Sequence, residues 1–142
     1  MTGRGSFLGS FAFAFQGLAS AWAQERNFRV QCLYTAGVAG LSLWTRPEPV
    51  LSLLVLLVMA TLLGAELMNS AVERAVDLCV SEFHPLARSA KDLAAASVLV
   101  VAMASAVVNL WVFLPLLPTD GAAVPAALLL GLLGWRFGRG SR

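Results

Sequence analysis

The sequence predicts an all-α integral membrane protein, with an N-terminal amphipathic surface helix followed by three transmembrane helices. Of its 142 residues, 58% are hydrophobic and only 13% are charged, whereas soluble domains carry roughly 25% charged residues. Mean hydropathy is +0.77. One compact helical bundle uses up this length, so any chemistry has to take place on the bundle itself. The net charge of +2 is too small to indicate nucleic-acid binding.

Residues 6–23 allow two interpretations. Arg4 precedes an apolar stretch that ends in Ala21-Trp22-Ala23, which fits a signal peptide with a small-x-small cleavage site. Large apolar residues in the same stretch also recur at intervals of three and four, as in an amphipathic helix that lies in the membrane interface. They are Phe7, Phe11, Phe15, Leu18 and Trp22. We expect the surface helix, and the signal peptide stays open as the alternative.

The first two spans are expected at residues 28–45 and 50–66, separated by a turn that contains Pro47 and Pro49. The first span needs flanking residues such as Phe28 to reach the 17 to 25 residues, roughly, that cross a bilayer. The second is strongly apolar, and its helix should continue beyond the membrane to about residue 79.

The third span is expected at residues 90–117, because Ser89 and Asp92 have the spacing of a capping box and the preceding segment, with Pro85, resembles a loop. We therefore treat residues 1–118 as one domain. Residues 119–142 form a hydrophobic extension, in which an apolar run at 122–137 either spans the membrane as a short fourth helix or lies along it.

Basic residues favour one orientation. If both termini and the segment 66–92 share one side, that side holds every basic residue except Arg46. By the positive-inside rule it is the cytoplasmic side, where ATP is available. The same distribution favours four spans over three and counts against the signal peptide. The two cysteines, Cys32 and Cys79, are expected to be buried thiols rather than a disulfide or a metal site.

The second predicted span runs directly into an acidic stripe, defined by polar residues at intervals of three and four that share one helix face. The stripe comprises Glu66, Asn69, Ser70, Glu73 and Asp77. Acids at a membrane boundary suit a hard cation such as magnesium, which is usually held together with phosphates. The alternative is that Glu73, Arg74 and Asp77 only form the solvated face of a helix. Glu66 fits that alternative less well, because an ionisable group beside an apolar span is costly and tends to be functional.

Other common catalytic motifs are missing from the sequence. A GxxxxGK[ST] phosphate loop is absent, since the only lysine, Lys91, follows Ala90. GxSxG and HExxH are absent as well, and no glycine elbow supports a serine–histidine triad built on His84. Phosphoryl transfer needs a metal, a positive group on the phosphates and a residue that activates the acceptor hydroxyl. Glu66, Glu73, Glu25 and Lys91 have the side chains for those tasks.

Four segments resemble the prokaryotic diacylglycerol kinase and undecaprenol kinase family over roughly residues 6–115. They are Glu66-Leu67-Met68-Asn69-Ser70-Ala71-Val72-Glu73 with Val76-Asp77, Glu82-Phe83-His84-Pro85-Leu86-Ala87, Ala90-Lys91-Asp92, and Glu25-Arg26-Asn27-Phe28-Arg29 with Gly17-Leu18 before it. The second and fourth segments look more like the undecaprenol kinase branch.

This resemblance implies a homotrimeric enzyme of the bacterial inner membrane, with its active site facing the cytoplasm, that transfers the γ-phosphate of magnesium-ATP to a lipid hydroxyl. Undecaprenol is the expected substrate, with diacylglycerol as the alternative and a non-catalytic membrane subunit as the hypothesis from another class. The implied roles are Glu66 as general base, Glu25 and Glu73 as metal ligands, and Asn69 as a positioning group. Nucleotide contacts are implied for Asp77, His84, Lys91, Asp92 and Gly17. Ser6, Phe13 and Phe83 depart from residues common in the family, arginine at the first and tyrosine at the other two, which puts nucleotide contacts at the N-terminal end in question.

Overall fold

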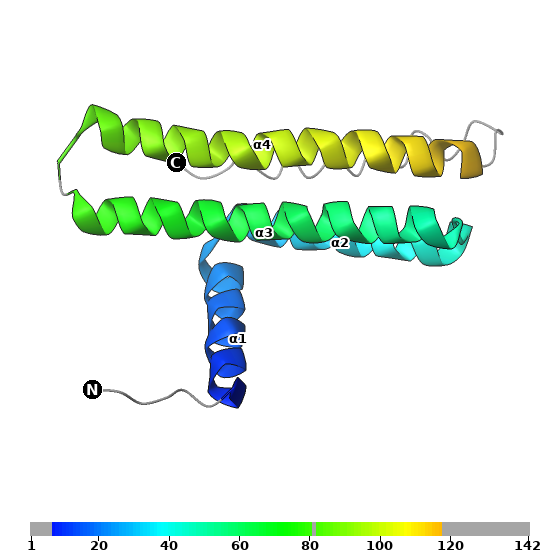
Figure 1. Cartoon of the computed structure of the whole chain (residues 1–142), viewed down its shortest axis with the longest axis horizontal. Helices are drawn as coiled ribbons and strands as arrows, with labels where there is room; N and C mark the ends of the chain where they lie inside the picture. The colour runs from blue at the N-terminus through cyan, green and yellow to red at the C-terminus, as the bar shows by residue number, and fades with distance from the viewer. Residues whose placement is uncertain (1–6, 81, 118–142) are drawn as a thin grey trace.

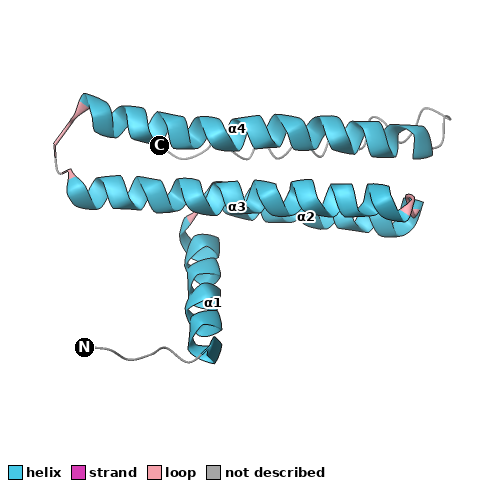
Figure 2. Ribbon diagram, in the orientation of Figure 1, coloured by secondary structure: helices cyan, strands magenta, loops and turns pink. Residues whose placement is uncertain are grey.

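The structure is a computed structural model that describes residues 7–80 and 82–117, and every regular element in that part of the chain is helical (Figure 2). The elements are α1 (Phe7–Gln24), α2 (Arg26–Thr45), α3 (Pro49–Cys79), α4 (Pro85–Phe113) and a short 3-10 helix, η1 (Leu114–Leu116). The predicted all-α class is therefore confirmed for these residues. The apolar run at 122–137, predicted to be a fourth span or a surface segment, lies outside them.

Helices α2, α3 and α4 run side by side along the long axis, and α3 and α4 form an antiparallel pair (Figure 1). Their shared core consists of Val38, Val55, Met59, Leu62, Val112 and Phe113. Many large apolar side chains on the outer faces stay exposed, for example Leu53 at 66% and Leu56 at 65%. An apolar outer surface of this extent is what a bilayer covers.

Two helices of the described part are long and apolar enough to cross a membrane, Pro49–Cys79 and Pro85–Leu116. Helix α3 has 31 residues, which corresponds to about 46 Å, whereas the hydrocarbon core is about 30 Å thick. About one third of α3 therefore extends beyond the bilayer if the helix starts at its edge. Helix α2 is not among the two candidates, so a third span at residues 28–45 stays a prediction.

The turn between α2 and α3 forms as the prolines predict. Arg46 caps α2 in the left-handed conformation, with φ 49°, and its N–H bonds to the carbonyl of Ser42. Pro49 then opens α3, where its missing N–H costs nothing.

The expected start of the third long helix near residue 90 is wrong, whereas the bounds of its membrane span stay a prediction. Helix α4 begins five positions earlier, with Pro85 as its first residue and His84 as N-cap, whose Nδ1 accepts a hydrogen bond from the Leu86 N–H at 3.2 Å. Proline favours the first helical position, so Pro85 initiates this helix instead of breaking it. Asp92 lies within the helix and pairs with Arg88 at 3.7 Å, so it does not complete a capping box.

Helix α1 runs across the direction of the other helices, and only its C-terminal end meets them (Figure 1). Ala21, at that end, is 4% exposed, while Phe13 and Phe15 are 70% and 67% exposed. Aromatic side chains that stay this exposed in the described part of the chain suit a helix in the membrane interface, which stays the prediction for α1. The thiol prediction was half wrong: both cysteines are free, but Cys79 is exposed and Cys32 is only half-buried.

Candidate active site

Glu66 lies on α3 at the point where the helix changes from apolar to polar, and only 3% of its surface is exposed. Its Oε2 accepts a hydrogen bond of 2.9 Å from Nε2 of Gln31 on α2. Burying a carboxylate is costly unless it is hydrogen-bonded. The α2–α3 contact thus provides this carboxylate with a polar partner inside the bundle.

Asn69 and Glu73 continue the acidic stripe one and two helical turns further along α3. Asn69 is 8% exposed, and its Nδ2 donates to Oε1 of Glu73 at 3.0 Å. Its Oδ1 is buried and has no hydrogen-bond partner among the described residues. Glu73 is also close enough to Glu66 to act on it electrostatically. Two oxygen acceptors, one amide and one carboxylate, are therefore available here for a ligand.

Glu25 joins the same region from the junction of α1 and α2. It is the N-cap of α2, and its Oε1 lies 2.8 Å from Nη2 of Arg74 on α3. The Arg74 guanidinium also donates to Oγ of Ser20 on α1 at 3.3 Å. Like Glu73, Glu25 acts electrostatically on Glu66. The junction of α1 and α2 is thereby held against the acidic stripe.

Asp77 and Lys91 form a second polar pair further out, where α3 and α4 extend towards their connecting loop. The Lys91 ammonium donates to Oδ1 of Asp77 and so bridges the two helices. Eleven positions separate Glu66 from Asp77, about 16 Å along the helix axis. The only lysine of the chain thus faces the stripe at the end opposite Glu66.

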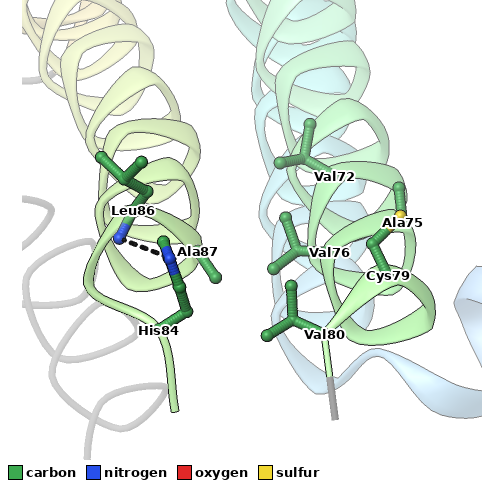
Figure 3. A pocket seen from close by; sticks show the side chains of 8 residues that line it. All are labelled: Val72, Ala75, Val76, Cys79, Val80, His84, Leu86 and Ala87. Atoms are coloured by element: carbon green, nitrogen blue, oxygen red, sulfur yellow. Dashed lines mark hydrogen bonds between the residues drawn. The ribbon is translucent and has the colours of Figure 1, made fainter. Parts of the chain in front are cut away.

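An apolar groove lies between α3 and α4 near the loop, and Figure 3 shows His84 at its edge. The groove is lined by Val72, Ala75, Val76, Cys79, Val80, His84, Leu86 and Ala87. Apolar grooves with a few polar groups are the usual form of small-molecule sites.

The structure does not join Gly17 or Asp92 to these groups. A Cβ added at Gly17 would meet no atom within 4 Å, so nothing described here requires a glycine. Asp92 is exposed and pairs with Arg88 on its own helix. Their proposed nucleotide contacts therefore rest on the family resemblance alone.

Across residues 7–80 and 82–117, no three histidine, cysteine or acidic side chains lie close enough to hold a metal ion. Magnesium in kinases is typically bound through one or two carboxylates plus the substrate's phosphates. The carboxylates of Glu25 and Glu73 and the unpartnered Oδ1 of Asn69 are hard oxygen donors of the type that this ion prefers.

Sequence reasoning missed two residues of this region. Gln31 could have been found as an amide within a predicted apolar span, a position where polar residues tend to be functional. Arg74 was counted only as part of a solvated helix face. Its contact with Glu25 bridges 49 positions, and no local spacing indicates such a contact.

The long helices of this chain are apolar, and towards one end they carry a buried carboxylate, further acids and a lysine. These features define an integral membrane protein with a polar site at that end. Comparison with known proteins identifies its family. The model of the family described as prokaryotic diacylglycerol kinase matches residues 12–113, and the chain belongs to this family of bacterial membrane lipid kinases, which are phosphotransferases.

Three relatives illustrate the range of the family. Undecaprenol kinase of Bacillus subtilis (strain 168) is 33% identical over 109 residues, which cover 77% of this chain and 89% of the relative. Diacylglycerol kinase of Synechocystis is 34% identical over 111 residues, covering 78% and 63%, so the chain spans less than two thirds of that relative. Diacylglycerol kinase of Escherichia coli (strain K12) is 28% identical over 113 residues, covering 78% and 93%.

Proposed function

We propose that this protein transfers the γ-phosphate of magnesium-ATP to the hydroxyl group of a membrane lipid, and that undecaprenol is its substrate. The observation that carries the proposal is the position of Glu66. It is a buried carboxylate that Gln31 holds by a hydrogen bond, on a helix long enough to cross the bilayer and extend beyond it. A lipid hydroxyl sits at the depth where such a helix leaves the hydrocarbon.

Glu66 is the general base in this proposal. An alcohol is a poor nucleophile until its proton has an acceptor, and a positioned carboxylate provides one. The lipid oxygen then attacks the γ-phosphorus, the bond from phosphorus to the β-phosphate oxygen breaks, and the proton remains on Glu66 until water removes it. Lipid phosphate and ADP are the products.

Glu25 and Glu73 would hold a magnesium ion, which would neutralise charge on the phosphates. Asn69 positions Glu73 through its Nδ2, and its buried, unpartnered Oδ1 leaves one more oxygen donor for a ligand. Glu25 has to share its carboxylate with Arg74, because one oxygen is already in contact with the guanidinium.

The nucleotide lies along the outer part of the acidic stripe. Lys91 provides positive charge to the phosphates by exchanging Asp77 for a phosphate oxygen, and Asp77 and His84 contact the nucleoside. The apolar groove next to His84 offers a surface for the base. Asp92 and Gly17 are assigned to the nucleotide by resemblance.

The enzyme is a homotrimer in the bacterial inner membrane, with this site on the cytoplasmic side. The distribution of basic residues supports that orientation. The trimer rests on the family resemblance.

Diacylglycerol is the second candidate substrate, because two of the three relatives above bear the name diacylglycerol kinase. Undecaprenol is favoured by the segments Glu25-Arg26-Asn27-Phe28-Arg29 and His84-Pro85-Leu86-Ala87. Assaying both lipids side by side in the same micelles, with labelled phosphate in the γ position of ATP, separates the two by their kcat/KM.

Glu66→Gln tests the base in the same assay. It keeps size and hydrogen bonding but cannot accept the proton, so we expect turnover to fall about 100-fold or more. Glu48→Gln is the matched control: the chemical change is the same, but this exposed residue caps the other end of α3. Near-normal turnover of Glu66→Gln would rule out Glu66 as the base, and wild-type protein that phosphorylates neither lipid would refute both proposed substrates.

A further inference from the structure

Gln31 is the hydrogen-bond partner of Glu66 within the part of the chain that the structure describes. It stands on α2, and its Nε2 donates to Oε2 of Glu66 across the α2–α3 interface at 2.9 Å. This contact joins positions that are 35 residues apart. The orientation of the Glu66 carboxylate therefore depends on a side chain from another helix.

The other end of the same amide is unsatisfied. Oε1 of Gln31 is buried and has no partner among the described groups. A buried acceptor without a partner is costly and calls for an explanation. An apolar side chain of similar length would avoid this cost, but it would leave Glu66 without its hydrogen bond.

The chemistry of a general base accounts for both ends of the amide. As a carboxylate, Glu66 can only accept hydrogen bonds, whereas as a carboxylic acid it carries an O–H that must be donated. Glutamine offers a donor and an acceptor at the end of one torsion, and this terminal torsion has a broad, roughly two-fold profile. A half-turn about this terminal torsion of Gln31 places Oε1, instead of Nε2, opposite Glu66.

We infer that Gln31 is a positioning residue that holds Glu66 in both protonation states of the reaction, through Nε2 before proton transfer and through Oε1 after it. This inference rests on the proposed role of Glu66 as the base. The proton comes from the lipid hydroxyl as the oxygen–phosphorus bond forms, resides on Glu66 while Oε1 accepts from it, and leaves to water, after which the amide turns back.

Other charges bear on Glu66 as well. Glu73 on α3 and Glu25 at the start of α2 repel its negative charge, and Arg74 is paired with Glu25. A second carboxyl group at position 31 would therefore add to existing repulsion, and it would share a proton with Glu66 instead of ionising independently. This makes Gln31→Glu an informative variant.

The experiment compares Gln31→Met and Gln31→Glu with wild-type protein, and with Val30→Met as matched control. Val30→Met introduces the same side chain one position earlier, at a site that is 41% exposed. Steady-state kcat and the KM values for lipid and ATP are measured in micelles between pH 6 and pH 8.5, and folding is followed by size exclusion and thermal unfolding.

We expect Gln31→Met to lower kcat about 10-fold or more, because loss of geometry at a reacting group has that scale of effect, with both KM values within about two-fold of wild type. In Gln31→Glu, a carboxyl group replaces the Nε2 donor, and it can donate a hydrogen bond to Glu66 only while it is protonated. The ratio of the kcat of this variant to that of wild type should therefore rise as the pH falls. The ratio for Gln31→Met should stay flat with pH, and Val30→Met should match wild type.

Wild-type kcat in Gln31→Met would overturn the inference and leave the proposed function intact. If Gln31→Met does not fold, Gln31→Glu decides: a rising ratio at low pH supports the inference, and a flat ratio overturns it. Absence of lipid phosphorylation by the wild-type protein would instead be a failure of the proposed function.

Discussion

The guanidinium of Arg74 lies 2.8 Å from a carboxylate oxygen of Glu25, and this contact joins the start of α2 to the polar part of α3. Arg74 also reaches Ser20, so the same side chain holds the end of α1. Arg29 on α2 adds to this junction, because its Nη1 donates to the carbonyls of Trp22 and Ala23 at the end of α1. Arg74 therefore fixes the position of a proposed metal ligand and shares the positioning of the crosswise helix with Arg29.

Arg74→Gln should lower stability only slightly. The two side chains are 44% and 27% exposed, and ion pairs with such access to solvent contribute about 0.5 kcal/mol. Activity should fall more than stability does, because Glu25, a proposed metal ligand, loses the Arg74 contact that fixes its position. Thermal unfolding in detergent and the magnesium dependence of kcat measure the two effects.

The charge-reversed double variant Glu25→Arg/Arg74→Glu separates the ion pair from the chemistry. It should recover most of the lost Tm, since the pair can form again, but it should stay inactive because no carboxylate stands at position 25. Recovery of activity along with Tm would mean that Glu25 acts only as the partner of Arg74.

Lys91→Met should raise the KM for ATP about 10-fold or more and leave the KM for lipid unchanged, because the charge-assisted contact with phosphate is lost. Asp77→Asn is the companion variant. It removes the carboxylate that contacts the nucleoside in the proposed site but keeps the Lys91 ammonium for the phosphates, so a smaller rise in the KM for ATP is expected. Equal effects of Lys91→Met on both KM values would indicate a general loss of structure.

The sequence was sufficient for the helical class because the apolar runs are long, and Pro47 and Pro49 mark a real boundary between two helices. The sequence was misleading at Pro85, because a proline after a polar residue such as His84 is as compatible with the first turn of a helix as with a loop. The acidic stripe followed from helical spacing alone. The contacts of Gln31 and Arg74 could not be predicted from helical spacing, because they link separate helices and depend on how those helices pack.

Glu73→Gln should increase the magnesium concentration needed for half-maximal activity, because one anionic ligand is lost while the hydrogen bond from Asn69 is kept. Excess chelator should abolish turnover of the wild type. Glu82→Gln, in the loop between α3 and α4, is an exposed control. An unchanged magnesium requirement in Glu73→Gln would remove Glu73 from the metal site, and chelator-resistant turnover would contradict metal dependence altogether.

A polar contact also joins α4 to α2, where Asn109 donates through Nδ2 to the Tyr34 hydroxyl at 2.9 Å. The Nδ2 also lies 4.0 Å from the Met59 sulfur. Met59 stands about 15 Å along α3 from Pro49, which is half the thickness of the hydrocarbon core of about 30 Å if α3 starts at its edge. Asn109 is 7% exposed and its Oδ1 has no partner in the described chain.

Tyr34→Phe should therefore cost roughly 0.6 to 1.7 kcal/mol, the range of hydrogen bonds between membrane helices, because it removes the oxygen that Asn109 bonds. Asn109→Leu removes the unpaired carbonyl as well, so the double variant Tyr34→Phe/Asn109→Leu should be about as stable as wild type. Unfolding of wild type, the two single variants and the double variant in detergent completes a double-mutant cycle. We expect a coupling energy that offsets most of the stability lost in the single variants. Additive losses would mean that the two side chains act independently, and that the amide contributes to packing rather than through its contact with Tyr34.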